Sequence, residues 1–258
     1  MYLKKFVEYI LSVIYYFFFF QLLIIFQPIQ WLCYNLIGYN AQKKSVDILN
    51  FFLLLCLKIL GTRIIFKYES EIPKNCPLIF VSNHQSTYDV SPIIWNLRKF
   101  HPKFVSKKEL GKGIPSISYN LKKGGSVLID RNGEKGVLDQ IKIFGENIEK
   151  NKWSAVIFPE GTRSKDGNMK NFRHGGLNTL IQSIPSAYII PVSINNSWKF
   201  GRKNYFPLPL GVKIKFLIGK PIKIDQTNSK NIIDSNNGSI SFNSNLKKGT
   251  TFIIELKK

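Results

Sequence analysis

The sequence predicts an α/β domain whose mixed central sheet is flanked by helices, preceded by an N-terminal two-helix membrane anchor. Three observations predict this fold class. Two long apolar segments lie within residues 1–62, short strand-like runs alternate with helical stretches after Gly61, and polar residues of distinctive chemistry directly follow several of those runs. The 258 residues are enough for one domain with an appendage.

The first apolar segment is long enough to meet a lipid bilayer. No charged residue occurs from Tyr9 to Gln42, and Tyr9–Phe26 is apolar or aromatic apart from two polar positions. A helix needs about 20 such residues to cross the hydrocarbon core, so this segment is at the threshold. Pro28 interrupts the apolar run shortly afterwards.

The second apolar segment, Val46–Leu60, is shorter and carries Asp47 and Lys58, which favours an interfacial or re-entrant helix. Core helices of a soluble protein and a cleaved signal peptide are the alternatives. The run of four phenylalanines exceeds what one buried helix face needs, and no small-residue cleavage site follows it. We therefore expect residues 1–62 to be a retained membrane anchor. The flanking basic residues favour the cytoplasmic face of the inner membrane: Lys4, Lys5, Lys43, Lys44, Lys58 and Arg63.

A domain of alternating strands and helices is expected over residues 63–224. Runs rich in β-branched and aromatic residues predict strands at Thr62–Tyr68, Pro77–Asn83, Lys103–Lys107, Gly125–Asp130, Ser154–Glu160, Ala187–Ile194 and Val212–Gly219. Apolar spacing predicts helices over Asn132–Asn151 and Gly175–Ile184. Functional sites of such domains lie in loops at strand ends.

The tail, residues 225–258, is expected to be a polar linker followed by a β-hairpin. The linker is rich in asparagine. Two alternating runs, at residues 239–244 and 250–256, flank the turn-like sequence NLKKG.

The charge and the cysteine and histidine usage restrict the classes of function. Thirty-seven Lys and Arg residues against 16 Asp and Glu residues give a net charge of +21, which predicts attraction to phosphate groups on lipids, nucleic acids or small molecules. The cysteines, Cys33, Cys56 and Cys76, have neither disulfide-framework nor zinc spacing, and the three histidines have no metal-ligand spacing. A cytosol-facing domain without a metal cofactor is the expectation.

The segment VSNHQSTYDV places His84 and Asp89 directly after a predicted strand. With Asp89 about one helical turn beyond His84, its carboxylate can accept a hydrogen bond from one imidazole nitrogen and leave the other free to take a proton. The pair would then be a general base and the group that orients it. The structural alternative is that Asp89 or Ser86 only caps a helix.

Other strand ends deliver further polar residues. Glu160, Gly161, Thr162 and Arg163 follow one predicted strand, where Gly161 permits a tight turn and Arg163 can hold a phosphate with two hydrogen bonds. Arg131 ends another strand.

These segments together resemble the glycerolipid acyltransferases, which include 1-acylglycerol-3-phosphate acyltransferase. The four blocks of that family are matched in order by Asn83–Asp89, Gly125–Arg131, Phe158–Ser164 and Ile190–Ile194. The resemblance covers roughly residues 62–222, and Lys107 lies in a basic stretch similar to the one between the family's first two blocks.

The resemblance implies a reaction and roles for the site residues. His84 is expected to deprotonate the sn-2 hydroxyl of lysophosphatidic acid for attack on acyl-CoA or an acylated carrier protein, with Asp89 as orienter and no resident cofactor or metal. Three basic residues would bind the acceptor phosphate, and three neighbours would shape the pocket: Lys107, Arg131 and Arg163, with Glu160, Gly161 and Thr162. Membrane lipids are expected partners and nucleic acid is not.

Three alternatives stay open. The same chemistry could act on glycerol 3-phosphate or a lyso-ornithine lipid. The charge and the aromatic content also allow a membrane-tethered binder of anionic lipid or nucleic acid, although no nucleic-acid-binding module is recognisable. A hydrolase with Ser86 as nucleophile is disfavoured, because the chain has no G-x-S-x-G elbow.

Overall fold

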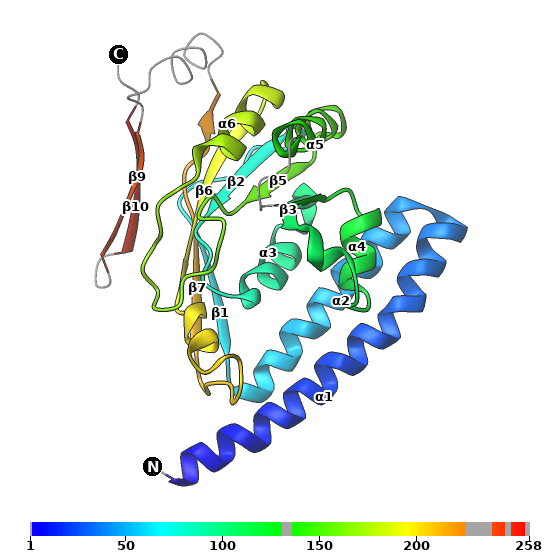
Figure 1. Cartoon of the computed structure of the whole chain (residues 1–258), viewed down its shortest axis with the longest axis vertical. Coiled ribbons are helices and arrows are strands. Elements are labelled where there is room, and N and C mark those ends of the chain that lie inside the picture. Colours follow the sequence, from blue (N-terminus) through cyan, green and yellow to red (C-terminus); the bar gives the residue numbers. More distant parts are fainter. Residues whose placement is uncertain (1, 131–135, 225–238, 246–248, 256–258) are drawn as a thin grey trace.

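The computed structural model describes residues 2–130, 136–224, 239–245 and 249–255 (Figure 1). Its centre is an eight-stranded sheet in which seven strands follow the order β1-β7-β6-β2-β5-β3-β4, with β8 paired to β6. The bounds are β1 Arg63–Tyr68, β2 Leu78–Ser82, β3 Pro102–Lys107, β4 Val127–Ile129, β5 Ser154–Ile157, β6 Tyr188–Asn195, β7 Lys213–Ile218 and β8 Ile222–Lys223. Neighbours run parallel except where β6 meets β7 and β8. The expectation of a mixed sheet is confirmed.

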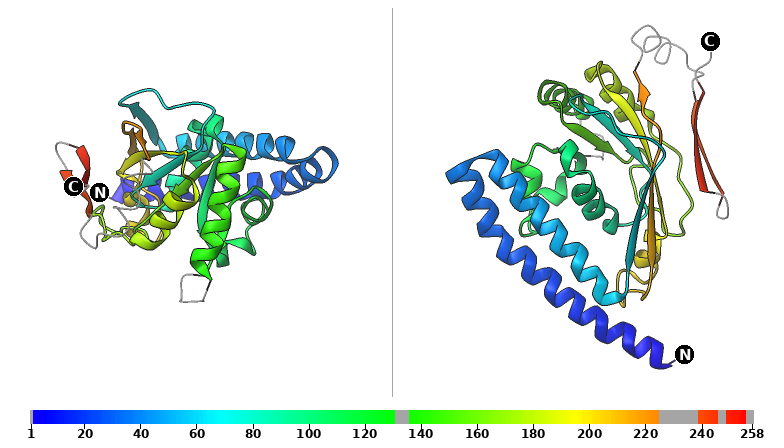
Figure 2. Two further views of the ribbon diagram at one scale, coloured as in Figure 1. Left: turned by 90° about the horizontal axis from the view of Figure 1, so that it is seen from above. Right: turned by 180° about the vertical axis from the view of Figure 1, so that it is seen from behind.

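Helices cover both faces of this sheet (Figures 1 and 2). One face carries α5 (Val137–Asn151) and α6 (His174–Ser183), whose apolar residues pack on alternate side chains of the central strands. The other face carries α3 (Val90–Asn96) and the end of the N-terminal helical pair. A further short helix, α4 (Ile117–Lys123), lies beside β4. Burial on both faces explains the uninterrupted apolar sequence of β2.

The N-terminal segment forms the expected pair of helices. The first helix, α1 (Tyr2–Leu32), continues through Pro28 into a π-helical turn at Cys33–Ile37, so the proline ends the apolar run but not the helix. The turn closes at Gly38, whose φ of 112° favours glycine. The second helix, α2 (Tyr39–Cys56), starts before the apolar block, because its polar Gln42, Ser45 and Asp47 are buried against the protein.

One segment of the described chain, Tyr2–Ile37, is long and apolar enough to cross a membrane by length and composition. Over its most apolar 18 residues the mean hydropathy is 2.2, and 22% of this stretch is buried. The side of α1 that faces away from the domain exposes large apolar residues along its length, among them Phe6, Ile10, Val13, Phe17, Phe20, Ile24, Ile25, Trp31 and Leu32. An exposed apolar surface of this size fits association with a membrane.

The opposite side of α1 is held to the domain by polar contacts along its length. Lys203 pairs with Glu8 at 2.9 Å, and the hydroxyl of Tyr16 donates to the carbonyl of Tyr205 at 2.6 Å. Nearer the turn, Ser116 Oγ donates to the carbonyl of Leu23 at 2.6 Å. The helix therefore lies along the domain and does not project from it.

The strands and helices agree with the sequence-based expectations with a few differences. All seven predicted strands form, and β6 contains Pro191 at the point where its neighbour changes from β8 to β7, so the missing N–H costs no ladder hydrogen bond. Helix α5 starts at Val137, not Asn132, and residues 131–135 lie outside the described residues. Helices α3 and α4 were not predicted.

The predicted hairpin of the tail is confirmed. Strands β9 (Ser239–Asn245) and β10 (Gly249–Glu255) pair in antiparallel fashion in a separate two-stranded sheet. The predicted linker, residues 225–238, lies outside the described residues.

Candidate active site

The loop after β2 is fastened to the end of the neighbouring strand β6 by one side chain. Asn83 Nδ2 donates to the carbonyl of Ile194 at 2.9 Å, and its Oδ1 accepts from the N–H of Ile194 at 2.7 Å. Because the two strands are parallel, both of their carboxyl ends lie at this edge of the sheet. This paired contact sets the position of His84, the next residue.

The predicted pair of His84 and Asp89 is formed directly. His84 Nδ1 lies 2.9 Å from Asp89 Oδ2. The same oxygen accepts from the backbone N–H groups of Gln85 at 2.8 Å and Ser86 at 2.9 Å, so it is a carboxylate acceptor and His84 donates from Nδ1. This tautomer leaves Nε2 as the lone-pair nitrogen, and within the described residues Nε2 has no hydrogen-bond partner.

The surroundings of the two side chains differ in a way that suits a base and its orienter. Asp89 is fully buried, whereas the His84 side chain keeps 17% of its surface exposed. The His84 ring stacks on Phe158 with the ring centroids 4.1 Å apart, which fixes the plane of the imidazole. Asp89 also serves in the capping box at Ser86. Capping and pairing with His84 are therefore performed by the same carboxylate.

The second carboxylate oxygen of Asp89 also has a partner. Oδ1 accepts a short hydrogen bond from the hydroxyl of Ser197, which begins the 3-10 helix Ser197–Lys203 just after β6. Ser197 is fully buried and its hydroxyl lies 3.4 Å from Gln85 Oε1. No local pattern in the sequence singles out Ser197, since 108 residues separate it from Asp89.

Glu160 links two loops of the site. Its Oε1 accepts from the backbone N–H of His84 at 2.8 Å, and its Oε2 accepts from the backbone N–H of Lys170 at 3.0 Å. Burial raises the pKa of this carboxyl above its usual value, and the two N–H donors partly oppose that shift. Both oxygens are thus occupied by backbone, and the side chain positions the His84 loop.

The other predicted binding residues lie around this centre. Gly161, with φ of 69°, makes the turn after β5, and Thr162 Oγ1 accepts from Lys170 Nζ at 2.9 Å. The exposed Arg163 donates to the hydroxyl of Tyr205 at 3.0 Å. Lys107 is exposed at the carboxyl end of β3, two strands from β2.

Arg131 lies outside the described residues. Its neighbour Asp130 is paired with Lys108 at 3.5 Å, so the chain enters that segment close to the carboxyl end of β3.

An apolar pocket of about 280 Å³ opens beside the His84 centre. It lies between α5, α6 and the carboxyl ends of β3, β4 and β5, and Phe158, on which His84 stacks, forms part of its wall. Apolar side chains make up most of the lining: Val105, Ile129, Val137, Leu138, Ile141, Ile157 and Phe158. Gly161 and Arg173 also line it, which makes Arg173 a charged residue of the site region that the sequence did not single out.

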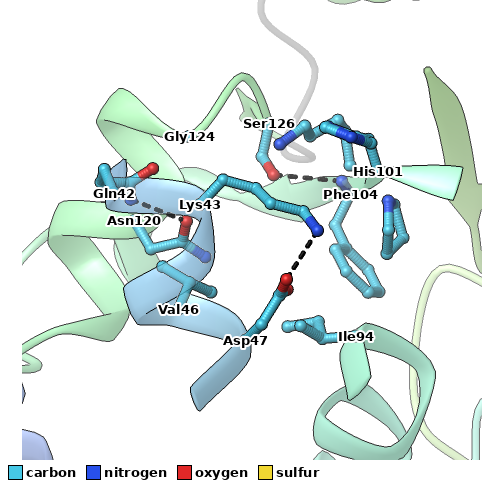
Figure 3. Close-up of a pocket in the computed structure, with 12 residues that line it drawn as sticks. Gln42, Lys43, Val46, Asp47, Ile94, His101, Phe104, Asn120, Gly124 and Ser126 are labelled. Carbon is cyan, nitrogen blue, oxygen red and sulfur yellow. Dashed lines mark hydrogen bonds and ion pairs between the residues drawn. The ribbon is translucent and has the colours of Figure 1, made fainter. Parts of the chain in front are cut away.

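A second, smaller pocket of about 20 Å³ lies at the opposite end of the sheet, between α2, α4 and the start of β3 (Figure 3). Lys43 reaches Asp47 at 2.6 Å, and Gln42 donates to Asn120 at 3.2 Å. Lys103 also lines this pocket, is only 6% exposed, and places its ammonium 4.8 Å from the ring centroids of both Tyr39 and Trp153. His84 is not among the residues that line this pocket.

The buried Lys103 is expected to make the stability of the protein depend on pH. Burial, with a smaller contribution from Lys43, lowers its pKa from 10.5 to about 7. Between those values the folded protein binds fewer protons than the unfolded chain, so the free energy of unfolding rises with pH above 7. We expect Lys103→Met to flatten this rise between pH 7 and 9. The variant should also be more stable than the wild type at pH 7, by about 2–4 kcal/mol. This figure allows for the lost contacts of the ammonium with the rings of Tyr39 and Trp153.

Urea unfolding followed by circular dichroism at several pH values measures this effect. Lys99→Met is the matched control, because Lys99 is an exposed neighbour on the short helix before β3. An unchanged slope in Lys103→Met, or a lower stability at pH 7, would contradict the assignment.

Comparisons with known proteins agree with this geometry. The sequence profile of the family described as Acyltransferase matches residues 63–195, about half of the chain, and the chain belongs to that family. The match contains His84, Asp89 and the Glu160–Arg163 segment.

Several curated relatives carry the name 1-acyl-sn-glycerol-3-phosphate acyltransferase. The protein from Helicobacter pylori is 42% identical over 92 residues (34% of this chain, 36% of that protein), and the one from Saccharomyces cerevisiae is 30% identical over 162 residues (61% and 50%). The matched part of the chain therefore spans between about a third and a half of these relatives.

A solved structure shares the fold. The crystal structure of the 1-acyl-sn-glycerophosphate acyltransferase PlsC from Thermotoga maritima superposes with a TM-score of 0.67 at 20% identity, covering 85% of this chain and 88% of that one. The superposed part of the chain is longer than residues 63–195, which match the Acyltransferase family, and the superposition confirms the predicted fold class.

Proposed function

We propose that the protein transfers a fatty acyl group from acyl-CoA or an acylated carrier protein to the sn-2 hydroxyl of 1-acylglycerol 3-phosphate, giving phosphatidic acid. The observation that carries the proposal is the His84–Asp89 pair, whose free Nε2 lies at the carboxyl edge of the sheet within the segment that matches the Acyltransferase family. The acceptor is taken from the relatives, which are named 1-acyl-sn-glycerol-3-phosphate acyltransferases.

In this mechanism His84 is the general base and Asp89 the group that orients it. Nε2 removes the proton from the acceptor hydroxyl as the oxygen attacks the thioester carbonyl, so a C–O bond forms. The C–S bond then breaks, and the imidazolium returns the proton to the leaving thiolate. Buried Asp89 stabilises the imidazolium while it exists. The reaction needs no metal and no resident cofactor, because the donor brings its own activated carbonyl.

The acceptor phosphate is assigned to Lys107, Arg131 and Arg163. The geometry supports Arg163 in this role, because the backbone that carries it lies beside His84. The N–H of the next residue, Ser164, donates to the carbonyl of His84 at 2.8 Å. Gly161 and Thr162 form the loop between Glu160 and Arg163, and the Glu160 side chain holds that loop to the backbone of His84.

The apolar pocket beside Phe158 suits a hydrocarbon chain of one substrate, because a chain of CH₂ groups gains about 0.8 kcal/mol for each group it buries. We assign residues 1–62 to the anchor, 63–224 to the catalytic domain and 225–258 to a linker with the hairpin. The anchor places the domain on the cytoplasmic face, where the lipid acceptor arrives from the bilayer and the thioester from the cytosol.

A panel of acceptors tests the substrate. Purified protein in mixed micelles is incubated with labelled acyl-CoA, or acylated carrier protein, and 1-acylglycerol 3-phosphate, glycerol 3-phosphate or a lyso-ornithine lipid. We expect the largest kcat/KM with 1-acylglycerol 3-phosphate. A larger value with either other acceptor would keep the chemistry and overturn the substrate.

A further inference from the structure

The carboxylate of Asp89 is oriented from two sides, and only one of them belongs to the histidine loop. On that side, Oδ2 accepts from His84 and from the N–H groups of Gln85 and Ser86. On the other side, Oδ1 accepts from Ser197, which comes from a different part of the chain. We infer that Ser197 is a positioning residue of the reaction, whose hydroxyl holds the Asp89 carboxylate in place and thereby sets both the orientation and the basicity of His84.

Burial makes this hydrogen bond consequential. Asp89 and Ser197 are both fully buried, so water cannot replace the hydroxyl if it is removed. A buried carboxylate oxygen without a donor is costly, and hydrogen bonds to charged groups are stronger than those between neutral groups. Gln85 Oε1, at 3.4 Å from the Ser197 hydroxyl, is an acceptor, and the amide nitrogen of the same side chain donates to the carbonyl of Gly167.

The parallel pairing of β2 with β6 brings Ser197 close to Asp89. The two hydrogen bonds between Asn83 and Ile194 fix the end of β6 beside the loop that carries His84. Asn196, in the left-handed conformation with φ of 73°, then turns the chain, and Ser197 starts the following 3-10 helix. Phe200 of that helix packs on Tyr88 with the ring centroids 4.4 Å apart, which keeps the helix against the Asp89 loop.

Removing the Ser197 hydroxyl should change the proton affinities of Asp89 and His84 in the same direction. A donor to the carboxylate favours its ionised, less basic form, so its loss raises the proton affinity of Asp89. In the Ser197 variant this carboxylate would stabilise the His84 imidazolium more than the wild-type carboxylate does, so the pKa of His84 is expected to be higher in the variant than in the wild type. Glu160 also contacts this loop, and its hydrogen bond with the backbone N–H of His84 stays the same. Asp166 lies nearby and accepts from the hydroxyl of Ser164, whose N–H donates to the carbonyl of His84.

Ser197→Ala tests the inference, which rests on the proposed function for its activity readout. We expect kcat to fall roughly 10-fold or more with KM little changed, because an Asp89 carboxylate held from one side only orients the His84 ring less well. The acid limb of the pH–kcat profile should move to higher pH. Ser45→Ala is the matched control, because Ser45 is also buried but bonds only to the carbonyl of Gln42 in its own helix.

A readout without substrate separates this inference from the proposed function. The nitrogen resonances of ¹⁵N-labelled histidine report the tautomer and the pKa of His84 by NMR, with His84→Ala to assign the signal. We expect a higher pKa in Ser197→Ala and a value between it and the wild type in Ser197→Cys, whose thiol is a weaker donor. If Ser197→Ala does not fold, the cysteine variant carries the same comparison.

An unchanged or lower pKa of His84 in the folded variants would overturn the role of Ser197, whatever happens to the rate. If the pKa rises as expected but the wild type transfers no acyl group to any acceptor, the proposed function fails and the role of Ser197 in orienting Asp89 stands.

Discussion

His84→Ala is expected to lower acyl transfer by about 10²–10⁴-fold, the usual contribution of a positioned general base. The hydroxyl of the acceptor is a poor nucleophile until its proton is removed, and in the described residues the free Nε2 of His84 is the group placed to remove it. Initial rates with labelled acyl-CoA and 1-acylglycerol 3-phosphate measure the loss. The fall should appear in kcat, because the alanine removes a group that acts on the transition state.

His174→Ala is the matched control for this variant. His174 is exposed at the start of α6, so its removal is expected to leave the rate and the thermal unfolding temperature close to those of the wild type. Circular dichroism should show that His84→Ala keeps its fold, since the ring is partly exposed and its loss leaves the Asp89 network in place. A His84→Ala protein with more than a tenth of the wild-type rate would remove His84 from the role of base.

Asp89→Asn is expected to have the next largest effect, and it should affect both rate and stability. The amide keeps the size of the side chain but removes the charge that stabilises the imidazolium, so kcat should fall by about 10²-fold or more. The buried position is surrounded by four donors, and a neutral acceptor binds them less strongly than a carboxylate. We expect the free energy of unfolding to fall by about 1–3 kcal/mol.

The control for the lost charge is Asp139→Asn, in the first turn of α5, where the carboxylate is exposed. Urea unfolding and initial rates are measured on the same preparations. A stable Asp89→Asn protein with wild-type kcat would show that the carboxylate does not assist His84.

The parts of the fold predicted from sequence are those with a local pattern. The strands were recognisable because each is a short run rich in β-branched or other apolar residues, and β2 is buried on both faces. Helices α3 and α4 have seven residues each and carry little periodicity, so only their tertiary contacts define them. The bounds of α2 were displaced because its polar residues Gln42, Ser45 and Asp47 face the protein interior, which hydropathy alone assigns to solvent.

The same distinction holds for the site. His84 and Asp89 are close in sequence, and their pairing followed from their spacing after a strand. Ser197 and Asn83 contribute through the parallel pairing of β2 with β6, which no short segment encodes. The expectation that Glu160 shapes a substrate pocket took no account of its backbone partners, which come from His84 and from Lys170 ten residues later.

The formation of phosphatidic acid by the wild-type protein tests the proposed function most directly. Purified protein in mixed micelles receives radiolabelled acyl-CoA, then acylated carrier protein in a parallel reaction, with 1-acylglycerol 3-phosphate as the acceptor and His84→Ala as the blank. Labelled phosphatidic acid with the label at the sn-2 position is expected from the wild type alone. Equal product from His84→Ala, or no product from the wild type with either donor, would contradict it.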